Sequence, residues 1–464
     1  MKYSQTIEAL KAALPTKSWT QDKDIIAPYL HEWRDRWQGG TPILLLPAST
    51  KEVAAAVKIC AQYKTPITIQ GGNTGLVGGQ TPQGEVLVST VRLNKIREIN
   101  ADNMHMVCAA GVTLQAVQDA AMRENAYFPL SLASEGSCTI GGNVSTNAGG
   151  VHVVKYGTAR VLVYGVEAVL ADGSIYDGLN PLRKDNTGYD LSQLLMGAEG
   201  TLGIITAVSV KLFAKPVQNL RAMLAVESPD TALQLLNKMR GDTHLCMFEL
   251  IPRLGMDYVT KHIAGQSDPF AHEYPWYVLV EWEFDSQTNP QEFVENILAD
   301  TVEDGLVLDA VIANSHAQNA ALLALRENLS ASQKPVGATI KHDISVPIAK
   351  VPAFITQANT ALAKYIPDCR PLPFGHLGDG NIHYNIGQPQ DMQPDIFMAL
   401  EPKINDIVYD IVDSLGGSIS AEHGIGILKK GQLSRRANPA KLRMMRQIKT
   451  ALDPNNILNP RVLL

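Results

Sequence analysis

The sequence predicts an α+β protein with two main domains. Three observations support this prediction: a length of 464 residues, helix and strand signals that follow one another in the first half, and a change of pattern near residue 218. A chain of this length can form roughly three units of about 150 residues, each with its own core. Apolar residues make up 45% and charged residues 19% of the chain, which is typical of a globular protein.

The first half combines a helix with short strands. Ser49 to Glu52 forms a capping box, which predicts the start of a helix, and the apolar residues that follow it are spaced on one helix face. Runs of β-forming residues at 67–69, 86–88 and 106–109 predict strands. We therefore expect a first domain over residues 1–218.

The pattern changes from about residue 220. Longer amphipathic helices such as 231–239 here alternate with strands such as 277–282, and we expect a second domain over residues 219–417. The last stretch, 418–464, has its own glycine motif and is expected to pack back toward the first domain.

Charge and cysteine content exclude several classes of protein. The net charge is −6, from 40 Lys and Arg against 46 Asp and Glu, so the chain offers no basic field for nucleic acid. The five cysteines include no C-x-x-C pair, which argues against a disulfide framework or a cysteine metal cluster. No apolar run approaches the roughly 20 residues of a membrane span, and residues 1–14 lack the apolar core of a signal peptide. We expect a soluble cytoplasmic protein.

Two glycine-rich stretches are the first candidate for a binding site. Residues 71–79 and 136–150 hold ten of the 36 glycines and no charged side chain. Glycine lets the backbone approach a ligand and present rows of N–H donors, which can hold a phosphate without a lysine. Neither stretch fits the Rossmann or the P-loop pattern. Tight turns are the alternative explanation, but two such stretches together favour a nucleotide.

A predicted hairpin supplies the second candidate. The segment from Pro373 to Asn385 has Asp379-Gly380 at its centre, flanked by alternating apolar residues, which is a strong hairpin signal. With Asp379-Gly380 as a two-residue loop, His376 pairs with His383 and both imidazoles leave the same face. Asn385 shares that face because it lies two residues further along the strand.

Two convergent imidazoles suit a first-row metal ion, most often zinc, with a carboxylate as third ligand. Glu422 is the candidate carboxylate, and the adjacent His423 is then a base beside the ion. A purely structural pair of histidines is the alternative. Arg326 and Lys341 add cations upstream, although a solvated helix face and an ordinary salt bridge explain them more simply from the sequence alone.

Six motifs in a fixed order carry a resemblance to a known family. They are residues 70–75, 136–150, 184–191, 197–206, 376–385 and 421–426. Through them nearly the whole chain resembles the flavin-dependent 2-hydroxyacid dehydrogenases of the vanillyl-alcohol-oxidase superfamily, most closely the D-2-hydroxyglutarate dehydrogenases. The resemblance implies an α+β fold, with a two-subdomain FAD-binding domain of the vanillyl-alcohol-oxidase (PCMH) type and an α+β substrate domain with an antiparallel sheet.

The resemblance implies FAD as cofactor, with its pyrophosphate on the two glycine-rich stretches. The positions that correspond to FAD contacts are Gly71, Gly72, Asn73, Thr74, Gly75, Gly78, Gly79, Ser134, Gly136, Ser137, Gly141, Gly142, Asn143, Thr146, Gly149, Ile204, Ile205 and Asn459. Because Asn73 stands where covalent members of the superfamily often have a histidine, we expect a non-covalent flavin.

The resemblance also assigns roles in the second half of the chain. His376, His383 and Glu422 correspond to ligands of a divalent metal ion, for which we expect Zn²⁺, with Mn²⁺, Fe²⁺ and Co²⁺ as alternatives. His423 corresponds to the catalytic base. The positions that correspond to substrate contacts are Arg326, Ser330, Lys341, Asn385 and His423. Relatives that use D-lactate tend to have an uncharged residue at the position of Lys341, so this lysine favours a substrate with a second carboxylate.

The implied reaction is oxidation of a D-2-hydroxyacid to the 2-oxoacid, with D-2-hydroxyglutarate as the first candidate substrate and D-lactate, glycolate or D-malate as alternatives. Electrons would pass from FAD to an external acceptor, which is open between an electron-transfer flavoprotein and the quinone pool. Two other classes stay open: a zinc hydrolase without flavin, and a nucleotide-binding protein without catalytic activity. A homodimer is open as well.

Overall fold

A computed structural model describes residues 3–464, which fold into two compact α+β units. Unit 1 contains the chain up to Gly150 together with residues 157–215 and 422–464. Unit 2 contains residues 151–156 and 216–421. The short segment 151–156 thus belongs to unit 2, although the chain on both sides of it belongs to unit 1.

Unit 1 contains a four-stranded sheet, a five-stranded sheet and a two-stranded ribbon. The strand orders are β1-β2-β4-β3, β5-β6-β10-β8-β9 and β11-β7. The strands are β1 (Trp19–Thr20), β2 (Leu44–Leu45), β3 (Ile67–Gln70), β4 (Val86–Ser89), β5 (Ile96–Asn100), β6 (His105–Ala109), β7 (Ala126–Tyr127), β8 (Val163–Val169), β9 (Ile175–Asp177), β10 (Ile204–Lys211) and β11 (Phe213–Ala214). The α-helices are α1 (Ser4–Ala13), α2 (Lys23–Ile26), α3 (Thr50–Gln62), α4 (Leu114–Arg123), α5 (Ile140–Thr146), α7 (Leu191–Leu195), α16 (Lys430–Arg436) and α17 (Pro439–Leu452).

The elements predicted in the first half are confirmed. The helix after the capping box is α3, and Ser49 Oγ accepts a hydrogen bond from the Glu52 backbone N–H at 3.3 Å. This bond satisfies one of the free N–H groups at the start of the helix. The predicted strands at 67–69, 86–88 and 106–109 are β3, β4 and β6.

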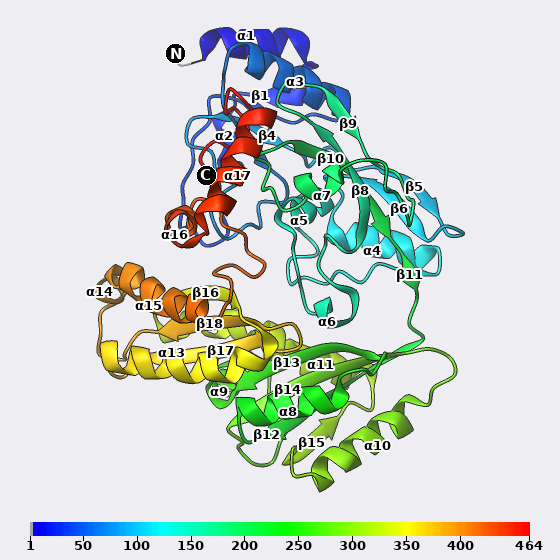
Figure 1. The fold of residues 1–464 in the computed structure, drawn as a ribbon, viewed down its shortest axis with the longest axis vertical. Coiled ribbons are helices and arrows are strands. Elements are labelled where there is room, and N and C mark those ends of the chain that lie inside the picture. Colours follow the sequence, from blue (N-terminus) through cyan, green and yellow to red (C-terminus); the bar gives the residue numbers. More distant parts are fainter. Residues whose placement is uncertain (1–2) are drawn as a thin grey trace. The chain divides into compact units, whose positions relative to one another are not determined.

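The C-terminal segment is tied to the first sheet of unit 1. Leu458 forms a parallel bridge with Ile67 at the start of β3. Asn459 Oδ1 accepts a hydrogen bond from the Ile69 N–H at 3.0 Å, and its Nδ2 donates to the Glu199 carbonyl at 2.8 Å. In Figure 1 the red C-terminal segment with helix α17 is accordingly drawn in unit 1, together with the blue N-terminal elements.

Unit 2 is built on one antiparallel sheet of seven strands, in the order β15-β12-β14-β13-β17-β18-β16. The strands are β12 (Gln218–Val226), β13 (Leu245–Pro252), β14 (Trp276–Phe284), β15 (Asp309–Ile312), β16 (Thr339–Ser345), β17 (Arg370–His376) and β18 (Asn381–Gly387). The α-helices are α6 (Val153–Tyr156), α8 (Pro229–Met239), α9 (Arg253–His262), α10 (Pro290–Glu303), α11 (His316–Glu327), α12 (Leu329–Ser332), α13 (Val351–Tyr365), α14 (Pro394–Ala399) and α15 (Glu401–Ser414). Helix α8 and strand β14 confirm the elements predicted at 231–239 and 277–282.

One face of this sheet carries the polar residues of interest. Helices α9, α11 and α12 pack on it, over a core that includes Met247, Ile251 and Phe374. Because alternate residues of a strand face opposite sides, Glu249 of β13 lies on the same face as Met247 and Ile251. His376 of β17 likewise shares the face of Phe374.

Among residues 3–464, no helix combines the length and the apolar character needed to span a bilayer.

Candidate functional site

The two glycine-rich stretches pack directly against each other in unit 1. A Cβ atom on Gly72 would lie 2.0 Å from the carbonyl oxygen of Ser137, and one on Gly71 would lie 2.4 Å from Thr139 Oγ1. Only glycine permits so close an approach. The structure therefore brings together the stretch that follows β3 and the stretch that leads into α5.

Several polar groups of these stretches are left for a ligand. Among residues 3–464, no acceptor bonds the backbone N–H groups of residues 72–77, and the buried atoms Asn73 Oδ1 and Thr139 Oγ1 have no hydrogen-bond partner. Asn73 is held in a left-handed conformation, with φ of +58°, and its Nδ2 donates to the His31 carbonyl at 2.6 Å. Because unpaired buried polar groups cost free energy, this arrangement fits the expected dinucleotide.

Four other residues predicted to contact FAD offer no comparable unpaired polar atoms. Asn143 Nδ2 donates to Cys138 Sγ at 3.5 Å, and Ile204 and Ile205 lie buried in β10. Both amide atoms of Asn459 are bonded within unit 1, as described above. Asn459 is thus a clamp between β3 and the loop that contains Glu199.

Glu422 and His423 lie in unit 1, in the loop before α16. Glu422 Oε2 accepts a hydrogen bond from the Gly150 N–H at 3.0 Å. The carboxylate of Glu199 holds the residues after His423, because it accepts from the N–H groups of residues 425 and 426, at 2.8 Å each. Burial raises the pKa of Glu199, and these two N–H groups offset only part of that effect.

The predicted hairpin exists in unit 2, but its register is shifted by two residues. Phe374, not His376, lies opposite His383. The predicted two-residue loop is wrong because residues 377–380 together form the turn: Leu377 is fully buried and the Gly380 N–H donates to the His376 carbonyl at 3.0 Å.

The shift leaves the two imidazoles together. A strand has a side-chain period of two, so a two-residue shift returns every side chain to the same face. The ring centroids of His376 and His383 lie 5.5 Å apart. The prediction that both rings leave the sheet at one place is therefore confirmed.

Strand β16 adds two charged residues beside the histidines. Lys341 lies opposite Asn385 and Asp343 opposite His383. Asp343 is buried, and it and His383 offer ligand atoms within 4.8 Å of each other. An imidazole and a carboxylate are donors that suit a first-row divalent ion, whereas His376 lies outside the described side chains whose ligand atoms meet this 4.8 Å limit. Asp343 was not predicted. It lies two residues after Lys341, so the two-residue repeat of a strand would have placed it on the same face as this lysine.

Arg326 joins this group through a second carboxylate that was not predicted. Glu249 is fully buried, and its carboxylate bonds both Arg326 Nε and His376 Nδ1. Burial alone would raise the pKa of Glu249, but Arg326 and His376 outweigh it and lower this pKa to about 2. The Arg326 guanidinium also lies over the Phe374 ring, 5.1 Å from its centroid. A charged residue inside the otherwise apolar run 245–252 was the only sequence signal for Glu249.

The two remaining predicted substrate contacts differ in their surroundings. Asn385 Nδ2 donates to the buried Gln333 Oε1 at 3.1 Å, so its amide is held in one orientation. Ser330, the remaining predicted substrate contact, is exposed on the short helix α12, just after α11.

A second group of metal-capable side chains in unit 2 is better described as a buried network. His152, Cys246 and Glu281 offer ligand atoms within 4.8 Å of one another. The Glu281 carboxylate, however, accepts from Arg221 Nε at 2.7 Å and Asn219 Nδ2 at 2.9 Å, and Cys246 Sγ donates to the Glu281 carbonyl at 3.4 Å. These side chains already form hydrogen bonds with one another, so a metal ion that bound the Glu281 carboxylate would have to displace Arg221.

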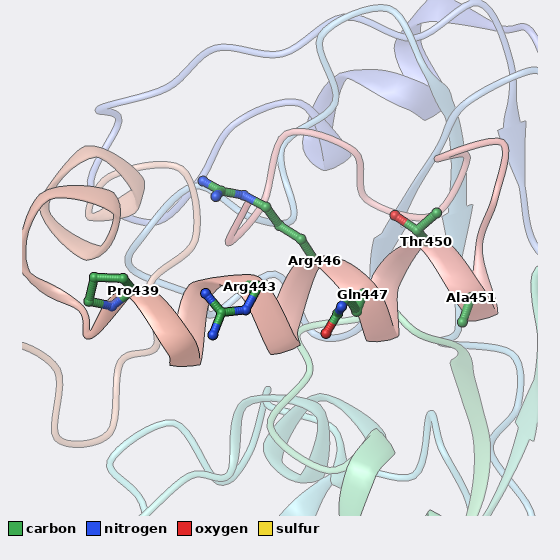
Figure 2. Close-up of a pocket in the computed structure, with 6 residues that line it drawn as sticks. All are labelled: Pro439, Arg443, Arg446, Gln447, Thr450 and Ala451. Atoms are coloured by element: carbon green, nitrogen blue, oxygen red, sulfur yellow. The ribbon is translucent and has the colours of Figure 1, made fainter.

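A groove along α17 lies on the surface of unit 1 (Figure 2). Its lining residues are Pro439, Arg443, Arg446, Gln447, Thr450 and Ala451. One helix supplies all of them, all are exposed, and none is a predicted site residue. This groove is therefore a feature of the helix surface and not a candidate for the flavin or metal site.

The chain matches two family models that together cover most of its length. Residues 41–178 match the FAD binding domain, and residues 215–463 match the C-terminal domain of FAD linked oxidases.

Curated relatives match over nearly the whole chain. The mitochondrial D-2-hydroxyglutarate dehydrogenases of Arabidopsis thaliana and Bos taurus are 35% and 36% identical to it. These matches cover 98% and 99% of this chain and 81% and 83% of the relatives. The D-2-hydroxyglutarate dehydrogenase of Xanthomonas citri pv. viticola is 35% identical, over 98% of this chain and 96% of the relative.

Solved structures show the same fold. A p-cresol methylhydroxylase with bound substrate superposes with a TM-score of 0.77 at 18% identity, covering 99% of this chain and 96% of the other. An alkyldihydroxyacetonephosphate synthase superposes with a TM-score of 0.76 at 17% identity, covering 99% and 85%. With the family models and the full-length relatives, the chain belongs to the FAD-linked oxidases of the vanillyl-alcohol-oxidase superfamily, in its 2-hydroxyacid dehydrogenase branch, and is an FAD-dependent oxidoreductase.

Proposed function

We propose that the protein oxidises D-2-hydroxyglutarate to 2-oxoglutarate with FAD and a divalent metal ion, and passes the electrons to an external acceptor. The relatives described above carry this activity in their names. The observation in the structure that best supports the proposal is the polar face of β16, β17 and β18. There Lys341 and Asn385 lie opposite each other next to the paired imidazoles, which suits an anionic substrate with metal-binding oxygens.

Each residue has one proposed task. His376, His383 and Glu422 bind the ion, as the family resemblance implies. Arg326 and Lys341 bind the substrate carboxylates, Asn385 and Ser330 orient the substrate, and a ring nitrogen of His423 takes the hydroxyl proton. When bound, the flavin supplies a hydride acceptor and the ion a Lewis acid that favours loss of that proton.

Anaerobic reduction of the flavin tests this proposal directly. The purified protein is mixed with D- and L-2-hydroxyglutarate, D-lactate, glycolate and D-malate, each with and without a chelator. We expect D-2-hydroxyglutarate to bleach the flavin fastest and the chelator to prevent bleaching. Fastest bleaching by D-lactate, glycolate or D-malate would reassign the substrate within the family, and a flavin that stays oxidised throughout would overturn the proposal.

Lys341→Ala is expected to lower kcat/KM for D-2-hydroxyglutarate by about 30-fold, because a charge-assisted contact contributes about 2 kcal/mol. The loss for D-lactate should be within about twofold, since D-lactate has no second carboxylate. Steady-state kinetics with both substrates measure the difference. Lys350→Ala, which removes an exposed lysine just beyond β16, is the matched control. Equal losses for both substrates would refute the assigned role of Lys341.

Gly72→Ala is expected to yield protein with little bound flavin. The new Cβ would lie 2.0 Å from the Ser137 carbonyl oxygen, so the two glycine-rich stretches must separate, at a cost of about 1–3 kcal/mol. The flavin-to-protein absorbance ratio and the unfolding temperature measure the effect. Gly40→Ala is the control because nothing lies within 4 Å of its Cβ position. Normal flavin content in Gly72→Ala would argue against the proposed FAD site.

A further inference from the structure

Glu249 connects two residues that the proposed function uses for different purposes. Its carboxylate bonds Nδ1 of His376, a proposed metal ligand, and Nε of Arg326, a proposed substrate contact. The pairing of β13 with β17 sets this position, because Glu249 lies opposite His376 in the strand register. Arg326 reaches the same carboxylate from the last turn of α11.

The bond to His376 decides which ring nitrogen carries the proton. An ionised carboxylate only accepts hydrogen bonds, so His376 carries its proton on Nδ1 and keeps the lone pair on Nε2. A histidine ligand is oriented in this way by a carboxylate behind it, which also raises its basicity. Glu249 therefore prepares His376 to bind an ion through Nε2.

The bond to Arg326 decides which edge of the guanidinium is available. Glu249 occupies Nε, and among residues 3–464 no other acceptor bonds this arginine. The Phe374 ring lies beneath the guanidinium plane and limits its tilt. The two terminal nitrogens are thus left for a carboxylate, in the paired geometry that arginine favours.

We propose that Glu249 is a positioning residue that couples metal binding to recognition of the substrate carboxylate. One rigid, fully buried carboxylate orients both the imidazole that binds the ion and the guanidinium that binds the substrate. Any movement of Glu249 therefore changes both sites together. This inference rests on the proposed function, since it concerns the ion and the hydroxyacid that the function requires.

Glu281 provides a matched control within the same sheet. It lies on the neighbouring strand β14, is 1% exposed, and also has an arginine and a histidine as partners, Arg221 and His152. None of these partners is a proposed ligand or substrate contact. Loss of the Glu281 charge should thus reproduce the structural cost of losing a buried carboxylate without its effect on binding.

The test compares the flavin-loaded wild-type protein with Glu249→Gln, Glu249→Asp and Glu281→Gln. Co²⁺ is the probe, and its Kd is measured by competition with a chelator, with and without 2-oxoglutarate. KM and kcat for D-2-hydroxyglutarate and the unfolding temperature of the metal-free protein are measured in parallel. If Glu249→Gln does not fold, Glu249→Asp carries the comparison, because it keeps the charge and shortens the side chain.

In the wild-type protein we expect 2-oxoglutarate to lower the Kd of Co²⁺. We expect Glu249→Gln to raise the Co²⁺ Kd by about 10–100-fold, to raise KM, and to abolish this effect of 2-oxoglutarate. Glu249→Asp should recover part of all three, and Glu281→Gln should lower only the unfolding temperature. An unchanged Co²⁺ Kd in Glu249→Gln, or an equal rise of this Kd in Glu281→Gln, would overturn this inference but not the proposed function. A wild-type protein that binds no Co²⁺ would overturn the proposed function as well.

Discussion

His423→Ala is expected to lower kcat by about two to four orders of magnitude, which is the usual contribution of a general base, and to leave FAD bound. In the proposed function this imidazole alone takes the hydroxyl proton. The glycine-rich stretches do not depend on its side chain, because they pack on each other through residues 71–72 and 137–139. Rapid mixing under anaerobic conditions measures flavin reduction, and the visible spectrum measures flavin content.

Two other variants serve as controls for His423→Ala. His316→Ala removes an exposed imidazole at the start of α11 and should leave flavin reduction unchanged. Glu199→Gln disturbs the carboxylate that holds residues 425 and 426, and should lower kcat less than His423→Ala does. A His423→Ala enzyme with normal flavin reduction would remove His423 from the role of base.

Removal of the divalent ion is expected to have the largest effect of all, with activity lost and flavin colour kept. A metal ion that lowers the pKa of a bound water from about 15.7 to about 7 changes its acidity by about 12 kcal/mol, and an effect of similar size on the substrate hydroxyl exceeds what one imidazole contributes. We would dialyse the protein against a chelator, measure turnover and the flavin spectrum, and add back Zn²⁺, Mn²⁺, Fe²⁺ or Co²⁺ singly.

His383→Ala provides the genetic counterpart to chelation. It should lose activity that no added ion restores, while His152→Ala, in the buried network around Glu281, should keep a metal-dependent activity. A fully chelated enzyme that still reduces its flavin with D-2-hydroxyglutarate would rule out the metal-dependent mechanism.

Much of the local structure could be predicted because its causes are local. The capping box at Ser49 sets the start of α3 through bonds within four residues. Apolar spacing identified α8 and β14 for the same reason. Glycine without charge in two separate stretches indicated a binding site, since few other needs explain that composition.

The hairpin shows how far such reasoning extends. The Asp-Gly signal located the turn, but the turn spans residues 377–380, in which Leu377 is buried, and not two residues. The face of the two histidines was nevertheless predicted correctly. The side chains of a strand repeat every two residues, and the predicted register differs from the observed one by two residues. An error of one residue would have placed one imidazole on the opposite face.

The sequence by itself determined where the distinctive residue types stand: two uncharged glycine-rich stretches, a hairpin that carries two histidines on one face, and the cations Arg326 and Lys341 upstream of it. Only the tertiary structure decided which of these groups share a carboxylate. Glu249, Arg326 and His376 are separated by at least 50 residues and meet through strand pairing and the end of a helix. A contact of that kind depends on how sheet and helix pack, and no pattern of neighbouring residues records it.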